Sequence, residues 1–249
     1  MVRRIYRALF REEDLTYFQV KFKETDLAIG VRKERFSPDL VWLVEKRVKE
    51  ERAVLEAYIK QDPVFLKTLK PHRVLEGAPE IASSMARAAS AAGVGPMAAV
   101  AGAFADLVGR LLTRYSRDVV VENGGDIYLK STRKRRVGIY AGESPLSNRV
   151  ALEILPEHTP TGVCTSSGTV GHSVSLGRAD AAVILASSAT LADAVATAAG
   201  NFAQTAEDIE KALAFARTIP GVSGAVLICG ENLGAWGKVK LIPAVLPVT

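Results

Sequence analysis

The sequence predicts an α+β fold, a mixed and largely antiparallel sheet with helices packed on it. Short apolar or alternating runs are joined in pairs by tight turns, as at Lys23–Asp26 and Asn123–Asp126, which is typical of antiparallel hairpins. The helical runs are grouped between these pairs, so a doubly wound parallel sheet is not expected. No linker rich in proline, glycine or serine divides the 249 residues, and we expect one domain over residues 1–249.

The N-terminal part is expected to form an antiparallel sheet and a long helix. Apolar and polar residues alternate in three runs, which predict strands. These runs are Tyr6–Phe10, Tyr17–Phe22 and Leu27–Val31. Ser37 followed by Pro38 predicts a helix start, because serine is a good N-cap and proline fits the first turn. The helical pattern ends where Asp62-Pro63 interrupts it.

The same criteria predict the remaining elements. Helices are expected at Glu80–Ala92, Met97–Tyr115, Leu191–Gln204 and Ala206–Ala216. Strands are expected at Val119–Val121, Ile127–Leu129, Val137–Tyr140, Val150–Ile154, Ser173–Leu176, Ala181–Ala186, Ala225–Cys229 and Val239–Ile242. The charge-free run 88–105 approaches the length of a membrane span, but glycine and proline break it and most of it is alanine. We expect two buried helices joined by a turn, and no membrane span.

Composition limits the partners and the compartment. The formal net charge is +5, and basic residues crowd into the connection after Leu129. They are Lys130, Arg133, Lys134, Arg135 and Arg136. No aromatic residues interleave with them, so a solvated hairpin tip explains them better than a nucleic-acid contact. Two cysteines, Cys164 and Cys229, and the lack of a signal-peptide pattern predict a reduced, cytoplasmic protein with both thiols buried.

A carboxylate and a hydroxyl lie four residues apart in the alanine-rich helix that contains Asp193 and Thr197. Both oxygens then lie on one helix face, one turn apart. Two such oxygens near a helix start are suited to holding Mg²⁺ against a phosphate. The alternative is structural: Thr190 caps the helix, Asp193 completes a capping box, and Thr197 bonds back to the preceding turn.

Three other motifs allow close approach of a ligand. Gly124 and Gly125 lie in a turn between two strands, followed by Asp126. Residues 162–169 are expected to form a loop of small residues whose N–H and O–H groups suit a phosphate. Its hydroxyl and glycine residues are Thr165, Ser166, Ser167 and Gly168. Gly102 and Asp106 lie in a helical stretch with a small face. Taken singly, each motif has an ordinary structural explanation.

The order of the four motifs resembles the ApbE-type family, the Mg²⁺-dependent FAD:protein FMN transferases. That family shows a Lys-Gly-Tyr-Ala-x-Asp-like segment, then Gly-Gly-Asp, then Thr-Ser-Gly followed by His, and finally Ala-Asp-Ala with Thr four residues after the Asp. The matching residues are Gly102 to Asp106, Gly124-Gly125-Asp126, Thr165 to Gly168 with His172, and Ala192-Asp193-Ala194 with Thr197. The resemblance runs from about Gly95 to Gly200.

The resemblance implies a duplicated T-fold-like sheet and a role for each motif. Asp193 and Thr197 inherit the metal site, and Asp193 is the candidate catalytic residue. The implied flavin-nucleotide residues are Gly102, Asp106, Gly124, Gly125, Asp126, Thr165, Ser166, Ser167, Gly168 and His172. Ala101 stands where the family has lysine, the loop after His172 is shorter, and an extra serine leaves the alignment of Ser166 against Ser167 open. The chain looks like a divergent, compact relative.

Two functions are therefore carried forward. In the first, the chain binds FAD and acts with Mg²⁺ as an FMN transferase or FAD pyrophosphatase. In the second, it is a non-catalytic flavin or nucleotide-binding module that has lost transfer. The expected partner is a small nucleotide ligand, and the sequence does not identify an acceptor protein. A third possibility is a structural or nucleic-acid-associated protein. It does not account for the ordered motifs, so we rank it below the other two functions.

Overall fold

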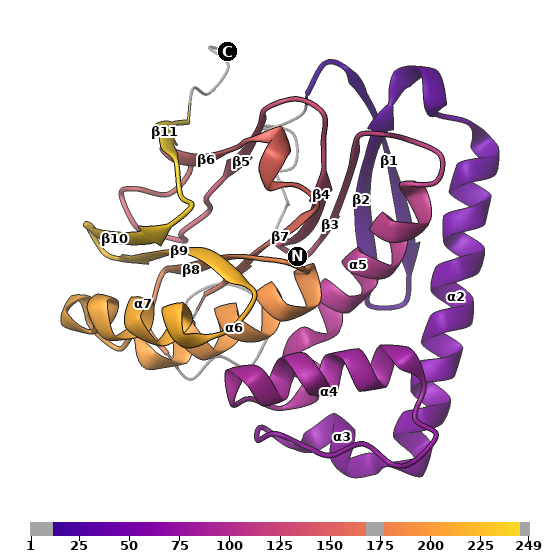
Figure 1. Ribbon diagram of the computed structural model, residues 1–249, viewed down its shortest axis with the longest axis horizontal. Helices are drawn as coiled ribbons and strands as arrows, with labels where there is room; N and C mark the ends of the chain where they lie inside the picture. Colours follow the sequence, from indigo (N-terminus) through magenta and orange to yellow (C-terminus); the bar gives the residue numbers. More distant parts are fainter. Residues whose placement is uncertain (1–11, 168–176, 245–249) are drawn as a thin grey trace.

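The computed structural model describes residues 12–167 and 177–244, which form three layers (Figure 1). A large sheet lies in the middle, with most helices on one face and a small sheet on the other. One apolar core lies between the helices and the large sheet. A second core, which includes Leu129, Leu152 and Val183, lies between the two sheets. The expected α+β class is confirmed.

The large sheet has eight strands, and every neighbouring pair is antiparallel. In order across the sheet they are β1 (Leu15–Phe22), β2 (Thr25–Arg32), β3 (Val119–Asn123), β4 (Asp126–Lys130), β7 (Thr161–Ser166), β8 (Ala181–Ala186), β9 (Val222–Cys229) and β10 (Asn232–Gly237). The small sheet contains β5 (Arg135–Gly138), β6 (Val150–Ile154) and β11 (Leu241–Pro243). The chain leaves the large sheet after β4, forms two strands of the small one, and returns as β7.

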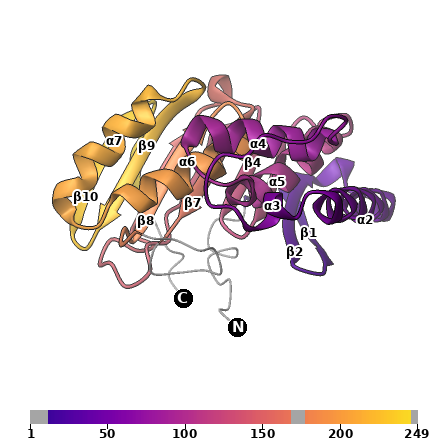
Figure 2. The same ribbon diagram turned by 90° about the horizontal axis from the view of Figure 1, so that it is seen from below.

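Along the chain, the helices occur in nearly the same order as the strands that they cover. They are α2 (Pro38–Gln61), α3 (Pro63–Lys67), α4 (Glu80–Ala92), α5 (Val100–Leu112), α6 (Ala189–Phe202) and α7 (Ile209–Thr218). Short 3₁₀ turns are η1 (Lys33–Arg35), η2 (Pro96–Ala99), η3 (Pro156–His158) and η4 (Ala206–Asp208). α2 packs on β1, α5 on β3 and β4, α6 on β7 and β8, and α7 on β9 and β10. α4 lies outside them, against α5 and α6, as Figure 2 shows from below.

Most expected elements are present, with some corrections. The expected helix Met97–Tyr115 is instead η2 followed by α5, because the chain after Pro96 first makes a 3₁₀ turn. β10 and α3 were not expected. The strand expected at Val137–Tyr140 begins earlier, at Arg135, and the one expected at Val239–Ile242 is β11, which begins at Leu241. The expected strands Tyr6–Phe10 and Ser173–Leu176 lie outside the described residues.

The loop expected at residues 162–169 was wrong, because Thr161–Ser166 is a central strand, β7. Its small side chains are explained by α6, which lies directly on it. A Cβ on Gly162 would come within 2.4 Å of the Ala189 nitrogen. The thiol of Cys164 donates a hydrogen bond to the Ala189 carbonyl over 3.3 Å. Small residues here let a helix start touch the strand, so they do not mark a loop.

α5 and α6 also approach closely, at Gly102. A Cβ on this residue would lie 2.2 Å from the Ala189 carbonyl oxygen, which no side chain tolerates. On the next turn of α5, Asp106 accepts hydrogen bonds from the first two amides of α6, Ala189 N–H and Thr190 N–H, each over 2.9 Å. The Thr190 hydroxyl donates to it over 2.6 Å. A carboxylate on α5 therefore caps the start of α6.

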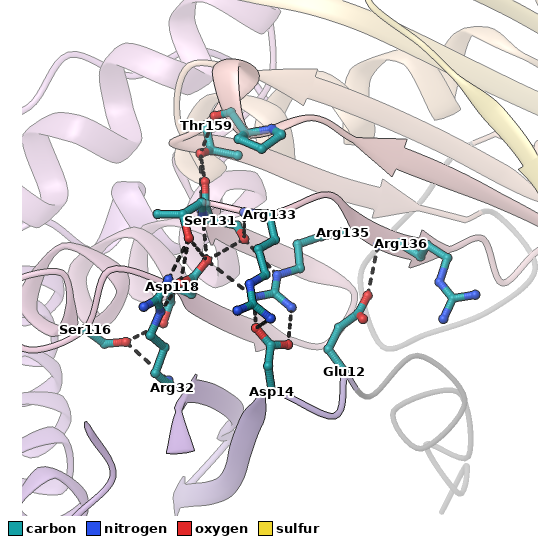
Figure 3. Close-up of polar contacts among 12 residues, drawn as sticks. Glu12, Asp14, Arg32, Ser116, Asp118, Ser131, Arg133, Arg135, Arg136 and Thr159 are labelled. Atoms are coloured by element: carbon teal, nitrogen blue, oxygen red, sulfur yellow. Dashed lines mark hydrogen bonds and ion pairs between the residues drawn. The ribbon is translucent and has the colours of Figure 1, made fainter. Parts of the chain in front are cut away.

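A buried polar network joins the ends of several strands around Asp118, which precedes β3 (Figure 3). Asp118 accepts hydrogen bonds from the Ser131 hydroxyl and the Thr132 amide, each over 2.6 Å, and from Arg32. The guanidinium of Arg135, only 3% exposed, lies 3.3 Å from Asp118 and forms a two-bond pair with Asp14 over 2.6 and 2.8 Å. Arg135 was expected on a solvated tip, and this is corrected.

The bent helix pair matches the expectation for residues 88–105. α4 ends at Ala92, and a turn through Gly93 and Gly95 leads into η2 and α5. Among the described residues, no single helix has the length and apolar character needed to cross a membrane. α4 and the η2–α5 segment meet that criterion only together, as a pair bent by 102°.

We predict that Asp106→Asn lowers the free energy of unfolding by about 2–4 kcal/mol, without added metal or nucleotide. The amide replaces one acceptor oxygen with a donor, which then faces the buried N–H and O–H groups at the start of α6. Chemical denaturation measures the change. Ser188→Ala, which removes a single bond at the same helix start, is the control and is expected to cost about 1 kcal/mol. Equal losses in the two variants would contradict the capping role.

The second stability prediction concerns acid. Burial alone would raise the pKa of Asp118, but hydrogen bonds from Ser131, Thr132 and Arg32 outweigh it and hold the pKa well below its usual range. A carboxyl with a depressed folded-state pKa contributes stability above its unfolded pKa of about 3.9 and loses it as the pH falls towards the folded value. Denaturation at a series of pH values should therefore show stability falling below about pH 4.

Asp118→Asn should remove that part of the acid dependence and cost about 3–5 kcal/mol at neutral pH, because two arginines lose their buried partner. Glu153→Gln is the matched control. Glu153 also pairs with two cations, Lys240 at 2.6 Å and Lys134 at 3.9 Å, but both lysines are exposed, so its loss should cost much less than the loss of Asp118. If Asp118→Asn keeps the full acid slope, the network is not its source.

Candidate functional site

The start of α6 differs from the capping box that the sequence also allowed. Ser188 is the N-cap, and its hydroxyl accepts the Leu191 N–H over 3.1 Å. Thr190 is buried and bonded to Asp106, so it does not cap the helix. Asp193 therefore does not complete a capping box with Thr190. The structural alternative, in which Thr190 caps the helix, is wrong.

Asp193 contacts α5 instead. Its Oδ2 accepts the Gly102 N–H over 2.9 Å. Gly102 is the third residue of α5, where backbone amides have no partner inside the helix. Asp193 of α6 therefore caps α5, just as Asp106 of α5 caps α6. The arrangement places one carboxylate at each helix start, where the helix dipole favours negative charge.

The Gly124–Gly125 turn joins β3 to β4 beside the start of α5. Both glycines have positive φ, 71° and 110°, which side-chain-bearing residues rarely adopt. The Gly125 N–H donates to Glu122 over 2.8 Å. The amide of Asn123 donates to the Ala101 carbonyl over 3.1 Å and so ties the strand end to α5.

β7 reaches the same place from the other side. A Cβ on Gly125 would lie 3.6 Å from the Thr165 carbonyl oxygen. Ser166 faces the helices, because its hydroxyl oxygen would lie 3.7 Å from a Cβ on Gly200 of α6. Ser167 is the last described residue before the gap, and both Gly168 and His172 lie outside the described residues.

Two carboxylates without a cationic partner dominate the electrostatics. Burial raises the pKa of Asp193 to about 7, although backbone hydrogen bonds from Gly102 and Ala101 act to lower it. The pKa of Asp126 is raised well above its usual value, first by burial and then by the charge of Asp193. In residues 12–167 and 177–244, neither forms an ion pair with lysine or arginine. The pair is short of positive charge.

Cys164 lies opposite Asp126 in the β4–β7 pairing, and its thiol donates to the Ala189 carbonyl. Burial raises the pKa of the thiol well above its ordinary value, and the nearby carboxylates raise it further. The thiol therefore stays protonated and serves as a small buried donor, which agrees with the expected buried cysteine.

The residues present fit a divalent cation only if the ligand supplies part of its shell. The described residues contain no group of three or more His, Cys, Asp or Glu side chains suited to a metal ion. Asp193 and Thr197 lie on one face of α6, and Thr197 is 9% exposed. Mg²⁺ often takes one or two carboxylates and completes its shell with phosphate and water. The excess negative charge at Asp126 and Asp193 suits such a cation.

The structure thus brings together Gly102, Gly124–Gly125, Asp126, Thr165 and Asp193, from three motifs far apart in the sequence plus the end of β7. Sequence reasoning missed Asn123 and Ser188. Ser188 had a signal, since serine directly before a helical run is a common N-cap. Asn123 had none, because its partner Ala101 is 22 residues away.

Comparisons with known proteins agree with the fold. A family model described as "AbpE bacteria" matches residues 7–241. A UPF0280 protein of Methanococcus vannielii is 43% identical over 229 residues, covering 90% of this chain and 91% of the relative. A UPF0280 protein of Methanosarcina acetivorans is 44% identical over 207 residues, covering 82% and 81%.

Solved structures give the same architecture at low identity. The flavinyl transferase ApbE of Pseudomonas stutzeri, in its apo form, has a TM-score of 0.57 at 14% identity and covers 90% of this chain and 94% of its own. The H257G mutant of the flavin transferase ApbE from Vibrio cholerae has a TM-score of 0.56 at 12% identity, with coverage of 90% and 97%. Since the family model spans nearly the whole chain, the protein belongs to the AbpE bacteria family, a divergent ApbE-like family.

Proposed function

We propose that this protein binds FAD at the edge formed by α5, α6 and the Gly124–Gly125 turn, and that it acts there with Mg²⁺ as an FMN transferase or FAD pyrophosphatase. The observation that carries the proposal is the meeting of Asp193 and Asp126, two poorly compensated carboxylates, beside the start of α5. Family membership and the transferase activities named for the structural relatives support the same reading.

In this proposal Asp193 and Thr197 hold the cation, and Asp126 adds a second negative charge on the same side. When bound, Mg²⁺ would neutralise the negative charge on the phosphate oxygens of FAD. The Gly124–Gly125 turn lets the ligand approach the backbone, and the small residues at the end of β7 leave room for it. Ser166, Ser167, Gly168 and His172 belong to the proposed flavin-nucleotide pocket by family resemblance, as does Asp106 behind it.

The chemistry is the breaking of the P–O–P link of FAD. AMP leaves, and the FMN phosphate passes either to a hydroxyl of an acceptor protein or to water. Asp193 would position the reacting phosphate through the cation, and it is the proposed catalytic residue. The acceptor protein is not identified by this chain, and the proposed compartment is the cytoplasm.

A non-catalytic nucleotide-binding module is the second candidate. Asp193 already has a structural partner in the Gly102 N–H, and Ala101 stands where the family has a lysine. Loss of a charge-assisted contact to phosphate would weaken binding by about 1.5–3 kcal/mol, or one to two decades in affinity. Such a loss would leave binding measurable and transfer slow.

Incubation with FAD and Mg²⁺, followed by chromatography of the nucleotides, tests the proposal. We expect AMP to form, with FMN either free or attached to protein. FAD binding without AMP would identify the non-catalytic module. If FAD neither binds nor reacts, with or without Mg²⁺, the flavin site itself is rejected.

A pair of substitutions at Asp193 separates its cap from its proposed metal role. Asparagine can still accept the Gly102 N–H but has no charge for Mg²⁺. We expect Asp193→Asn to keep most of the stability and to abolish the effect of Mg²⁺ on FAD binding, as measured by titration of flavin fluorescence. Asp193→Ala should lose both, with a stability cost of about 1 kcal/mol from the missing cap. If Asp193→Asn responds to Mg²⁺ as the parent does, Asp193 is a cap only.

A further inference from the structure

The segment from the end of α2 to the start of α4 exposes an unusual number of aliphatic side chains. Val64, Leu66, Leu69 and Leu75 are each 47% to 61% exposed. They account for four of the nine large apolar side chains exposed among the described residues; of the other five, three lie on or just before α2. We call residues 60–75 the arch. Exposed apolar groups concentrated in one segment usually mark an interaction site.

The backbone of the arch is held firmly, so the exposure is not a consequence of looseness. Asp62 accepts hydrogen bonds from the Tyr58 hydroxyl and from His72, each over 2.8 Å, and the Leu75 N–H donates to the same hydroxyl over 3.1 Å. Phe65 is buried, with its ring edge-on to Tyr58 at 5.3 Å. These contacts fix the arch from inside while its aliphatic side chains point outward.

Packing from the neighbouring turn confirms this fixed position. A Cβ on Gly95 would lie 1.9 Å from the Thr68 carbonyl oxygen, so the arch backbone lies directly against the turn before η2. That turn leads into α5. The arch, which contains α3, is therefore part of the outer helix layer and follows directly on the end of α2 (Figure 2).

The arch is also predominantly basic at its surface. Lys60, Lys67, Lys70 and Arg73 are exposed along the arch. The only acidic residue between positions 60 and 75 is Asp62, which is buried and bonded to Tyr58 and His72. Four cations therefore lie along the arch among the four aliphatic side chains, and one exposed carboxylate, Glu76, directly follows Leu75. A partner of matching chemistry is anionic and apolar.

The shape of the arch favours a deformable partner. The hollow lined by Pro63, Val64, Lys67 and Thr68 is shallow and open, so it does not enclose an anchoring side chain from a protein partner. A lipid surface needs no preformed groove, because the aliphatic side chains enter the acyl region while lysine and arginine remain among the headgroups. We propose that the arch docks the protein on an anionic lipid surface. This inference is independent of the flavin proposal.

The test is sedimentation of the full chain with vesicles of phosphatidylglycerol and phosphatidylcholine in equal parts, compared with pure phosphatidylcholine. We expect binding to the anionic vesicles only, and weaker binding when salt rises from about 0.1 M to about 1 M. The triple variant Lys67→Gln, Lys70→Gln, Arg73→Gln should lower the partition coefficient on the order of a hundredfold, at about fivefold per cation. Leu69→Glu should lower it by about tenfold or more.

Two controls match these variants in charge and polarity. Lys46→Gln, Lys49→Gln, Lys211→Gln removes the same charge from α2 and α7, and Trp42→Glu places a carboxylate near the opposite end of α2. Both should bind as the parent does. Near-ultraviolet circular dichroism checks that each variant is folded. If Leu69→Glu does not fold, the triple variant of Lys67, Lys70 and Arg73 still tests the proposal.

Several results would overturn the proposal. The proposal is rejected if the parent protein does not bind anionic vesicles, if it binds neutral ones equally well, or if the control variants lose as much binding as the arch variants. Analytical ultracentrifugation provides a further test of the proposal. If the parent is a dimer that Leu69→Glu dissociates, the occupant of the arch is a second copy of the chain and not a lipid surface.

Discussion

The crossing of α5 and α6 depends on two carboxylates that each cap the other helix. Asp106 accepts the first amides of α6, and Asp193 accepts the third amide of α5. Gly102 makes this possible, because any side chain there would collide with the backbone of α6 at Ala189. The two helix starts are locked together, and each has a carboxylate where its dipole favours negative charge. The alanine-rich composition of α6 follows, since it is buried on nearly every side.

This contact also sets the position of the sheet beneath it. The start of α6 touches Gly162 and Cys164 of β7, and Asn123 holds the end of β3 to Ala101. The β3–β4 turn, the end of β7 and the two helices therefore share one rigid corner. A candidate site built in that corner is preorganised by elements of the core, since the motifs meet only because the helices cross at Gly102.

The sequence predicted elements well where one local pattern decides them. α4, β6 and β8 have the expected bounds, because α4 is rich in alanine and the short strands β6 and β8 consist mostly of apolar residues. It failed at β7, where small hydroxyl residues resemble a loop and only the overlying helix explains them. The four site motifs and their order were also readable. Local patterns do not encode contacts between distant residues. Asp193 caps α5 through Gly102, 91 residues away, and the buried Arg135 pairs with Asp118, 17 residues away.

Two groups of buried or half-buried carboxylates show how a structural network differs from a candidate site. Asp118 is surrounded by two arginines and three donors from Ser131 and Thr132, and its pKa is held low. Its charge is balanced within the protein, so it needs no further partner. Among the described residues, Asp126 and Asp193 have no lysine or arginine partner, and their pKa values are raised. A protein that only needed stability gains nothing from leaving two carboxylates unbalanced at one rigid corner. The imbalance is relieved either by protons or by a cation, and a cation would leave coordination positions for phosphate.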